Sequence, residues 1–388
     1  MANESLPTGS RDHPPMEITP RQLKAFRGRL LDWYRDGHRS LPWRGAVDPY
    51  HVLVSEVILQ QTRVEQGLPY YERFVARFPT LADLAEAGEE DVLRVWEGLG
   101  YYRRARHLHA AAQIIRERHE GRVPDDLEAL TRLPGIGPYT AAAVGSIAYG
   151  LPRAALDGNA LRVLSRVFRV ADDPRRSPVR RLLQTVADRL LPDGAAGDYN
   201  QAVMELGARI CTPRDPDCTT CPLAGVCGAR ASGDPTGYPV PADRPRRDLR
   251  TEAALALFDG TGRLLVRRRP TGGLLGGLWE LPAGPVAPDT PPREAAVRLA
   301  ETILPVPCVV TESLAVIRHG FSHFRLRLEV FMSTLPRPEH PPEVEPPLRW
   351  ADREERIHLP FPRFIRKLVE TMAPPDRMEP PDPKTTRV

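Results

Sequence analysis

The sequence predicts a multidomain protein in which an all-α amino-terminal part is followed by a smaller α+β domain. Three observations lead to this prediction. Apolar residues recur at helical spacing through most of the first 210 residues, four of the five cysteines fall between positions 211 and 227, and strand-like runs appear only beyond position 249. The expected parts are a disordered lead at 1–18, a helical core at 19–210, a cysteine loop at 211–230, a linker at 231–248, the α+β domain at 249–372 and a disordered tail at 373–388.

Helix-start signals recur through the amino-terminal part. Thr19-Pro20 and Asp48-Pro49 each place a capping residue before a proline, which suits the first turn of a helix. Apolar residues follow each pair at the spacing of an amphipathic helix. Further helices are expected at about 139–149, 159–169, 177–191 and 198–210.

The four clustered cysteines, Cys211, Cys218, Cys221 and Cys227, have the spacing C-x6-C-x2-C-x5-C. Four thiolates on a short loop can surround a tetrahedral zinc ion or an iron–sulfur cluster. Zinc sites usually present two tight pairs of cysteines, and only Cys218 and Cys221 form such a pair, so the spacing favours iron–sulfur modestly. Disulfides or unrelated thiols are the remaining alternative, which an intracellular chain disfavours. Cys308 is expected to be a small buried apolar residue.

Two turns and one glutamate in a helix contain candidate functional residues. In LPGIGPYTA, Gly135 and Gly137 allow successive N–H groups at a helix N-terminus to hold a phosphate, although an ordinary corner between helices is the alternative. In ALDGN, Asp157 precedes a helix, where plain N-capping is the alternative to catalysis. Glu56 has apolar neighbours that should bury it and raise its pKa, unless it is a peripheral residue that reaches solvent.

Composition excludes several classes of protein. The chain has 388 residues, a formal net charge of +4 and 41% hydrophobic residues, which is too apolar for a wholly disordered chain. It contains no run of about 18 apolar residues that would cross a membrane, and its first residues lack the apolar core of a secretion signal. We therefore expect a soluble cytoplasmic protein with no membrane partner. Because the net charge is small, any binding of nucleic acid must come from a shaped local surface.

In this order, the hairpin, the aspartate of LDGN and the four-cysteine loop resemble the helix-hairpin-helix DNA glycosylases that carry a 4Fe-4S cluster. Within that superfamily, SEVILQQT, GLGYYRRARHLH, LPGIGPYTAAAV, LDGNALRVLSR and the later FSH are similar to MutY-type adenine DNA glycosylases. The resemblance covers nearly the whole chain apart from its two tails. It implies a helix-hairpin-helix glycosylase core, an iron–sulfur cluster bound by the four loop cysteines, and a Nudix-like carboxy-terminal domain.

The resemblance also implies a reaction. A monofunctional enzyme of this kind removes adenine paired with 8-oxoguanine or guanine in double-stranded DNA and leaves an abasic site. By resemblance, Glu56 protonates adenine N7, Asp157 stabilises the sugar cation and Asn159 orients the two carboxylates. Tyr139 occupies the position of the Schiff-base lysine in bifunctional relatives, so efficient lyase chemistry is not expected.

The same resemblance assigns residues to DNA binding. Gln61 and Tyr101 are expected to insert into the duplex or contact the opposite base once the adenine has left the stack. Arg44 in LPWR resembles a residue that lines the adenine pocket. Ser322 and His323 of FSH would distinguish 8-oxoguanine from guanine, and an ordinary strand turn with an exposed histidine is the alternative.

Three rival functions are set against this one. A thymine glycosylase for G:T mismatches can share tyrosine at the hairpin position but lacks a domain like 249–372. A non-catalytic iron–sulfur DNA-binding protein would not need both Glu56 and Asp157. A Nudix nucleotide hydrolase places metal-binding glutamates one turn after an Arg-Glu pair, whereas Arg293-Glu294 is followed by AAVR. We expect a monomer associated with the nucleoid, and its protein partners cannot be predicted from the sequence.

Overall fold

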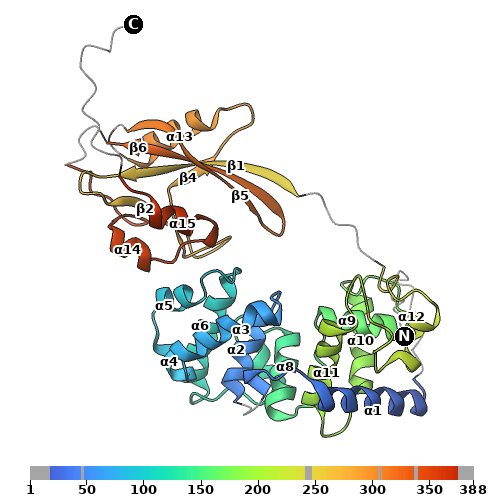
Figure 1. Cartoon of the computed structure of the whole chain (residues 1–388). Helices are drawn as coiled ribbons and strands as arrows, with labels where there is room; N and C mark the ends of the chain where they lie inside the picture. Colours follow the sequence, from blue (N-terminus) through green and yellow to red (C-terminus); the bar gives the residue numbers. More distant parts are fainter. Residues whose placement is uncertain are drawn as a thin grey trace, which may run out of the picture. The chain divides into compact units, whose positions relative to one another are not determined.

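The computed structural model describes residues 18–44, 48–240, 247–304, 306, 308–335 and 340–374 (Figure 1). The lead expected at 1–18 and the tail expected at 373–388 lie almost entirely outside these residues, as does the 241–246 part of the expected linker. The chain divides into two compact units. Unit 1 comprises residues 1–64, 80–85 and 110–244, and unit 2 comprises residues 65–79, 86–109 and 245–388.

The helices of unit 1 begin where the sequence satisfies their free N–H groups. Thr19 caps α1 (Pro20–Gly37) through reciprocal hydrogen bonds with Gln22, and Asp48 caps α2 (Pro49–Leu59) by accepting from the N–H of Tyr50. The other elements that lie wholly or largely in this unit are η1 (Pro42–Arg44), α4 (Leu81–Glu86), α7 (Leu127–Arg132), α8 (Pro138–Tyr149), α9 (Gly158–Val167), α10 (Ser177–Leu190), α11 (Ala196–Arg209), η2 (Ala224–Val226) and α12 (Gly228–Ala231).

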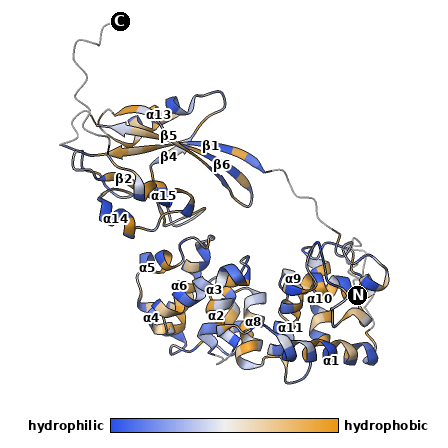
Figure 2. Cartoon of the chain, in the orientation of Figure 1, coloured by the Kyte–Doolittle hydropathy of each residue, from blue (hydrophilic) through white to orange (hydrophobic). Residues whose placement is uncertain are grey.

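A hydrophobic core joins α1, α9, α10 and α11, which form one group of helices in Figure 1. Phe26, Leu164, Leu183 and Tyr199 are among its fully buried residues. Figure 2 shows hydrophobic and hydrophilic residues mixed along these helices, as expected for helices that bury one face. The four helices predicted between 139 and 210 are confirmed to within two residues at each end. None of the helices in the described ranges is long and apolar enough to cross a membrane.

Two glycines let α11 lie close to α8 and α9. A Cβ atom at Gly197 would lie 2.8 Å from the carbonyl oxygen of Ser146 on α8. A Cβ at Gly207 would lie 2.5 Å from the Cβ of Asn159 on α9. Both distances are shorter than real side chains tolerate, so glycine is required for this packing. The helix α11 is thereby held against the two helices that carry Tyr139 and Asn159.

The residues that follow α12 pack against the core of unit 1. The N–H of Val240 donates to the carbonyl of Ala171 at 2.9 Å, and Arg166 donates to the carbonyl of Tyr238 at 3.1 Å. These residues belong to the segment 231–248 that was expected to be a linker. Its richness in proline and glycine predicts irregular backbone but says nothing about the hydrogen bonds that such backbone makes.

The described part of unit 2 contains a seven-stranded mixed sheet. Its main order is β3-β2-β1-β6-β5, while β4 pairs with β1 and β7 pairs with β2. β1 and β6 run parallel, and the other pairs are antiparallel. The turn at Asp259–Gly262 joins β1 to β2, as Phe258 pairs with Leu264. The strands are β1 (Asp248–Phe258), β2 (Leu264–Arg268), β3 (Trp279–Glu280), β4 (Ala283–Pro285), β5 (Val309–Gly320), β6 (Phe324–Thr334) and β7 (Leu348–Ala351).

Helices cover both faces of this sheet. α13 (Pro292–Ile303) packs through Ala296 and Ala300 on the face that contains Ala253, whereas α15 (Arg363–Thr371) packs on the face that contains Ala254. Cys308, expected to be buried, is half-buried at the edge of these cores. The remaining helices of unit 2 are α3 (Val64–Arg77), α5 (Glu89–Val95), the first part of α6 (Arg103–Arg118) and α14 (Arg353–His358).

Candidate active site

Two helices of unit 1 bring a buried acid and a tyrosine together. Glu56 lies on α2 and is 6% exposed, and Tyr139 lies in the first turn of α8. The hydroxyl of Tyr139 donates a hydrogen bond to Oε2 of Glu56 at 2.7 Å. Asp157, at the start of α9, is close enough for its charge to raise the pKa of both groups. Three residues that the sequence analysis selected separately therefore form one site.

Glu56 is poised to hold a proton near neutral pH. Burial raises its pKa from 4.5 to about 7, because an ionised carboxylate loses its hydration inside the protein. The hydrogen bond from Tyr139 and the charge of Arg44 lower the pKa, but they do not outweigh burial and the nearby Asp157. The alternative of a peripheral glutamate that reaches solvent is wrong.

Asp157 combines a capping role with a half-buried position in the site. Its Oδ1 accepts from the N–H of Ala160 at 2.6 Å, and its Oδ2 accepts from Nδ2 of Asn159 at 2.9 Å. Burial raises the pKa of Asp157, while these hydrogen bonds and the charge of Arg162 lower it. N-capping and placement beside Glu56 are thus properties of the same side chain, and one does not exclude the other.

Arg162 fixes the amide of Asn159. Its Nη2 donates to Oδ1 of Asn159 and to the carbonyl of Gly207, both at 2.8 Å. Its Nε donates to the carbonyl of Cys211 at 2.8 Å. Because the amide oxygen is bound to a guanidinium, the amide NH₂ must point toward Asp157. The side chains of Arg162 and Asn159 therefore connect the cysteine loop to the carboxylate of Asp157 at the start of α9.

The four loop cysteines line one pocket in unit 1 and form no disulfide. Among the described residues, no group of three or more His, Cys, Asp or Glu side chains is placed to hold a metal ion. The buried Arg166 donates to Sγ of Cys211 at 3.3 Å and to the carbonyl of Thr212 at 2.7 Å. Four soft thiols around one pocket are the donor type that binds an iron–sulfur cluster or a zinc ion.

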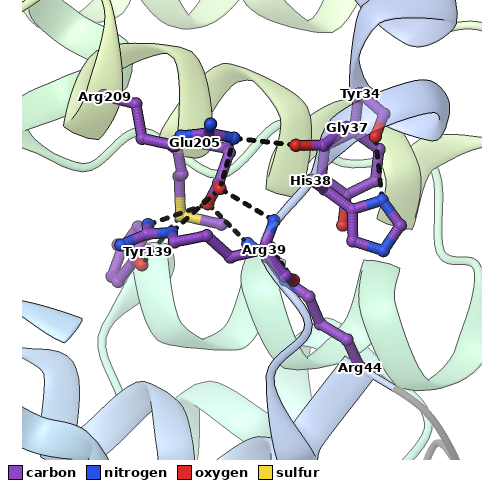
Figure 3. A network of polar contacts seen from close by, with 9 residues as sticks. Tyr34, Gly37, His38, Arg39, Arg44, Tyr139, Glu205 and Arg209 are labelled. Atoms are coloured by element: carbon purple, nitrogen blue, oxygen red, sulfur yellow. Dashed lines mark hydrogen bonds and ion pairs between the residues drawn. The ribbon is translucent and has the colours of Figure 1, made fainter. Parts of the chain in front are cut away.

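A second polar network in unit 1 is centred on Glu205 (Figure 3). The carboxylate of Glu205 accepts from Arg39 at 2.8 Å and from Arg44 at 3.0 Å, and its side chain is 0% exposed. Burial alone would raise the pKa of Glu205, but the hydrogen bonds and charges of the two arginines lower it to about 2. Arg44 also lies over the ring of Tyr34, with its Cζ 5.5 Å from the ring centroid. Its Nε is buried and has no hydrogen-bond partner among the described residues.

The turn between α7 and α8 leaves backbone N–H groups accessible. Gly135 has a φ of 74°, a conformation that favours glycine. Gly137 is the N-cap of α8 and, having no side chain, makes no capping hydrogen bond. Both glycines are exposed. The start of α8 can therefore accept an anion from outside the protein.

Gln61 and Tyr101 have unusual backbone conformations in their separate units. Their φ angles are 58° and 49°, in the left-handed region that residues other than glycine rarely adopt. Both side chains are exposed, and Tyr101 is 49% exposed despite its size. The guanidinium of Arg104 lies between the rings of Trp96 and Tyr101, with its Cζ 5.3 Å and 5.5 Å from their centroids. Strain of this kind is typical of functional positions.

The tip of the β5–β6 hairpin presents Ser322 and His323 to solvent. The neighbouring Phe321 and Phe324 stack with ring centroids 4.6 Å apart, and the N–H of Phe321 donates to the carbonyl of Phe324 at 2.9 Å. The loop is thus anchored by its aromatic residues, while Ser322 and His323, whose Oγ and Nδ1 atoms lie 3.4 Å apart, are exposed to solvent.

Comparison with known proteins identifies the family. Residues 54–189 match the HhH-GPD superfamily of base excision DNA repair proteins, and residues 253–371 match the NUDIX domain. The adenine DNA glycosylase of Homo sapiens is 36% identical over 389 residues, which cover 86% of this chain and 71% of that protein. The chain belongs to the adenine DNA glycosylases. It is therefore an enzyme that removes adenine in base excision repair, with a helix-hairpin-helix core and a Nudix-like domain.

Further relatives support this membership of the adenine DNA glycosylases. The adenine DNA glycosylase of Mycolicibacterium smegmatis is 44% identical over 209 residues, covering 54% of this chain and 70% of that protein. A solved thermostable thymine-DNA glycosylase has a TM-score of 0.50 and 28% identity, covering 55% of this chain and 98% of that chain. Because that structure is matched almost completely, it has no counterpart for nearly half of this adenine glycosylase.

Sequence reasoning missed three residues of this glycosylase site. Glu205 and Arg162 look like ordinary charged residues on helices, and only the folded chain places them beside Arg44 and Asn159. Gly207 did leave a signal, because glycine inside a helix costs about 1 kcal/mol relative to alanine and so points to a packing reason.

Proposed function

We propose that this adenine glycosylase is monofunctional and acts on adenine opposite 8-oxoguanine or guanine in duplex DNA, leaving an abasic site. The single observation that carries the proposal is the hydrogen bond between Tyr139 and Glu56 beside Asp157. It pairs a buried acid with a phenol at the position where lyase chemistry would need an amine. The test is a glycosylase assay on duplexes with 8-oxoguanine:A and G:A pairs, with and without alkali to cleave abasic sites. Cleavage of the DNA strand without alkali would contradict the proposal.

Glu56 acts as general acid and then as general base. The protonated carboxyl donates its proton to N7 of the flipped adenine, and the N-glycosidic electron pair leaves with the base. The oxocarbenium-like sugar that remains is stabilised by the carboxylate of Asp157, whose ionised form the developing positive charge favours. Water then adds to C1′ and returns a proton to Glu56. Asn159 keeps Oδ2 of Asp157 in place through its 2.9 Å hydrogen bond.

Tyr139 supplies no amine, so no Schiff base forms with the opened sugar. Its phenol stays protonated, because burial raises its pKa well above the ordinary value, and it donates to Glu56. Replacing Tyr139 with lysine should introduce strand cleavage that borohydride traps as a covalent complex. Failure of a folded, DNA-binding Y139K protein to form that complex would argue against this assignment.

Arg44 lines the pocket for the flipped adenine. Its guanidinium is held by Glu205 on one side, and its buried Nε is a donor without a partner in the part of the chain that the structure describes. A buried donor left without a partner costs about 1–3 kcal/mol, which a ring nitrogen of adenine would recover by accepting from it. Arg44→Lys keeps the charge but removes the planar fork, and it should raise KM more than it lowers kcat.

DNA is held open by residues from the exposed turns. Gln61 and Tyr101 fill the space left by the flipped base or contact the opposite base, and the start of α8 at Gly135 and Gly137 binds a phosphate. Substituting Tyr101 with alanine should weaken binding to substrate duplex while leaving binding to a duplex with a preformed abasic gap less affected. An equal loss of affinity for both duplexes would contradict the proposal that Tyr101 fills the space left by the flipped base.

Ser322 and His323 select 8-oxoguanine over guanine. Exposed hydroxyl and imidazole groups at the hairpin tip can bond to the N7–H and O8 that distinguish the oxidised base. The double variant S322A/H323A should lose preference for 8-oxoguanine:A over G:A while still cleaving G:A. Unchanged discrimination would refute the role.

The cysteine loop holds a 4Fe-4S cluster through Cys211, Cys218, Cys221 and Cys227. The donor set of four thiols around one pocket fits such a group, which when bound cross-links four positions of the loop. Arg166 would donate to one of its sulfur ligands. Iron and sulfide analysis should give four of each per chain, whereas one zinc per chain would contradict the proposal.

The enzyme works as a monomer on nucleoid DNA in the cytoplasm. Every residue of the proposed chemistry comes from one chain, so the reaction needs no second copy. Light scattering of the protein bound to a short duplex should give one chain per duplex, and two chains would contradict this.

A further inference from the structure

Among the described residues, no helix or strand covers one face of the unit 2 sheet next to the 321–323 loop. On this face α13 packs against Ala253 and Phe331. Closer to the loop the same face exposes Leu249, which is 58% exposed, and Val316, which is 40% exposed. The alternation of side chains along β1, β5 and β6 places the arginines described next on this face.

Three arginines lie on the uncovered face. Arg318 on β5 is directly opposite Arg327 on β6, and Arg325 follows two residues nearer the loop, opposite Gly320. Like charges directly opposite each other destabilise a sheet, so this arrangement costs stability in the free protein. Arg327 is offset by Glu329, whose carboxylate lies 2.7 Å away. Within the described residues, no acidic side chain pairs with Arg318 or Arg325.

These two arginines are fixed in position relative to the loop. Arg325 is two residues from His323, and the Gly320–Arg325 pair closes the hairpin. Arg247, just before β1, donates to the carbonyl of Phe321 at 3.1 Å and so ties the loop to the neighbouring strand. Diagonal neighbours across a strand pair are about 7–8 Å apart, so two long side chains can reach successive phosphates of one nucleic-acid strand.

We propose that Arg318 and Arg325 form a phosphate-binding pair that grips the backbone of the DNA strand read by the 321–323 loop. The partner is duplex DNA because the chain is a DNA glycosylase, the pair is cationic and unneutralised, and it adjoins the loop. The contact adds affinity without regard to base identity. This inference rests on the proposed function of Ser322 and His323, which places that loop at the DNA.

The test is equilibrium binding of the full chain to an 8-oxoguanine:A duplex whose adenosine carries a 2′-fluorine, so that the glycosidic bond survives. Each phosphate contact contributes about 0.9 to the slope of log K against log salt, so R318Q/R325Q should lower that slope by about 1.8. The ratio of Kd at 200 mM to Kd at 50 mM NaCl should then fall about tenfold relative to the native protein. R318K/R325K should restore the native slope.

Controls separate this proposal from misfolding and from the loop's role. R298Q removes an exposed arginine that pairs with Glu294 on α13, and it should leave the slope unchanged. Because R318Q/R325Q relieves repulsion with Arg327, its melting temperature should equal or exceed that of the native protein. An unchanged salt slope in R318Q/R325Q overturns the proposal.

The proposed function and this inference fail in different ways. If S322A/H323A loses 8-oxoguanine preference while R318Q/R325Q binds like the native protein, the loop role stands and the phosphate pair is wrong. If R318Q/R325Q loses slope while S322A/H323A keeps full discrimination, the phosphate pair stands and the loop role is wrong.

Discussion

The hydroxyl of Tyr139 lies 2.7 Å from Oε2 of Glu56 and donates a hydrogen bond to it. This contact opposes burial, which is the dominant influence on the carboxyl. The result is a pKa of about 7, at which both protonation states of Glu56 are populated near neutrality. A group that must give a proton and later take one back works best when its pKa is close to the working pH.

The rate of the chemical step should fall as the pH rises through about 7, because only protonated Glu56 can donate to adenine. Single-turnover rates between pH 5 and pH 9, measured with saturating enzyme, test this. E56Q should be inactive at every pH. A rate that stays constant up to pH 9 would contradict the role of Glu56 as the acid.

The same pKa predicts how stability depends on pH. Between the ordinary value of 4.5 and about 7, the folded state holds one more proton at Glu56 than the unfolded state, so stability falls as the pH rises through this window. The loss is about 3 kcal/mol, and it should be absent in E56Q. The melting temperature of E56Q relative to that of the native protein should therefore be higher at pH 8 than at pH 5.

Tyr139→Phe should move the alkaline limb of the pH–rate profile upward by about one unit, because the phenol lowers the pKa of Glu56 when it donates to the carboxylate. The maximal rate should survive, since the acid itself remains. The pH–rate profile of Y139F checks this, and a downward shift would show that the phenol stabilises the protonated form instead.

Arg162→Gln should slow base removal about ten- to hundredfold, since it breaks charged hydrogen bonds that orient Asn159 toward Asp157. Binding to uncleavable duplex should change little, because Arg162 is turned inward. Iron content must be measured alongside, as Arg162 also holds the carbonyl of Cys211. If R162Q has the native rate and the native iron content, the hydrogen bond from Arg162 is not needed to orient Asn159.

Gly207→Ala should destabilise the fold by about 1–3 kcal/mol, because the added methyl overlaps Asn159. It should also lower the rate of base removal, since Asn159 must move. Gly28→Ala on α1 is the matched control: nothing lies within 4 Å of its added methyl, so it should stabilise the helix by about 0.5–1 kcal/mol. Denaturant unfolding and single-turnover rates of the two variants test the pair.

Glu205→Gln should cost about 3–5 kcal/mol at neutral pH, because it leaves the charges of Arg39 and Arg44 without a buried partner. The stabilisation from Glu205 is present above 4.5 and lost as the pH falls toward about 2, so E205Q should also unfold with less dependence on acid pH. Asp198 lies on the same helix as Glu205 and forms an exposed ion pair with Arg35 of α1. Asp198→Asn, which breaks this pair, should cost less than about 1 kcal/mol.

Local signals predicted much of this fold and part of the site. Thr19 and Asp48 reveal helix starts because capping chemistry is confined to a few neighbouring residues, and Glu56 is recognisable because its own helix is apolar. Glu205 could not be predicted in the same way, since its partners Arg39 and Arg44 are more than 160 positions away and only packing brings them together. Nor does the sequence reveal the strained backbone of Gln61 and Tyr101, because neither is a residue that prefers a left-handed conformation.

The helix α11 contributes no reacting group, yet it touches the surroundings of all of them. Met204 lies 3.2 Å from the hydroxyl of Tyr139, Glu205 holds Arg44, and Gly207 backs Asn159. A displacement of this one helix would therefore disturb base recognition and bond cleavage together. Inherited or selected changes that impair the enzyme should accumulate on the inward face of α11 as readily as at Glu56 or Asp157, and they would escape notice in any screen restricted to residues that touch the substrate.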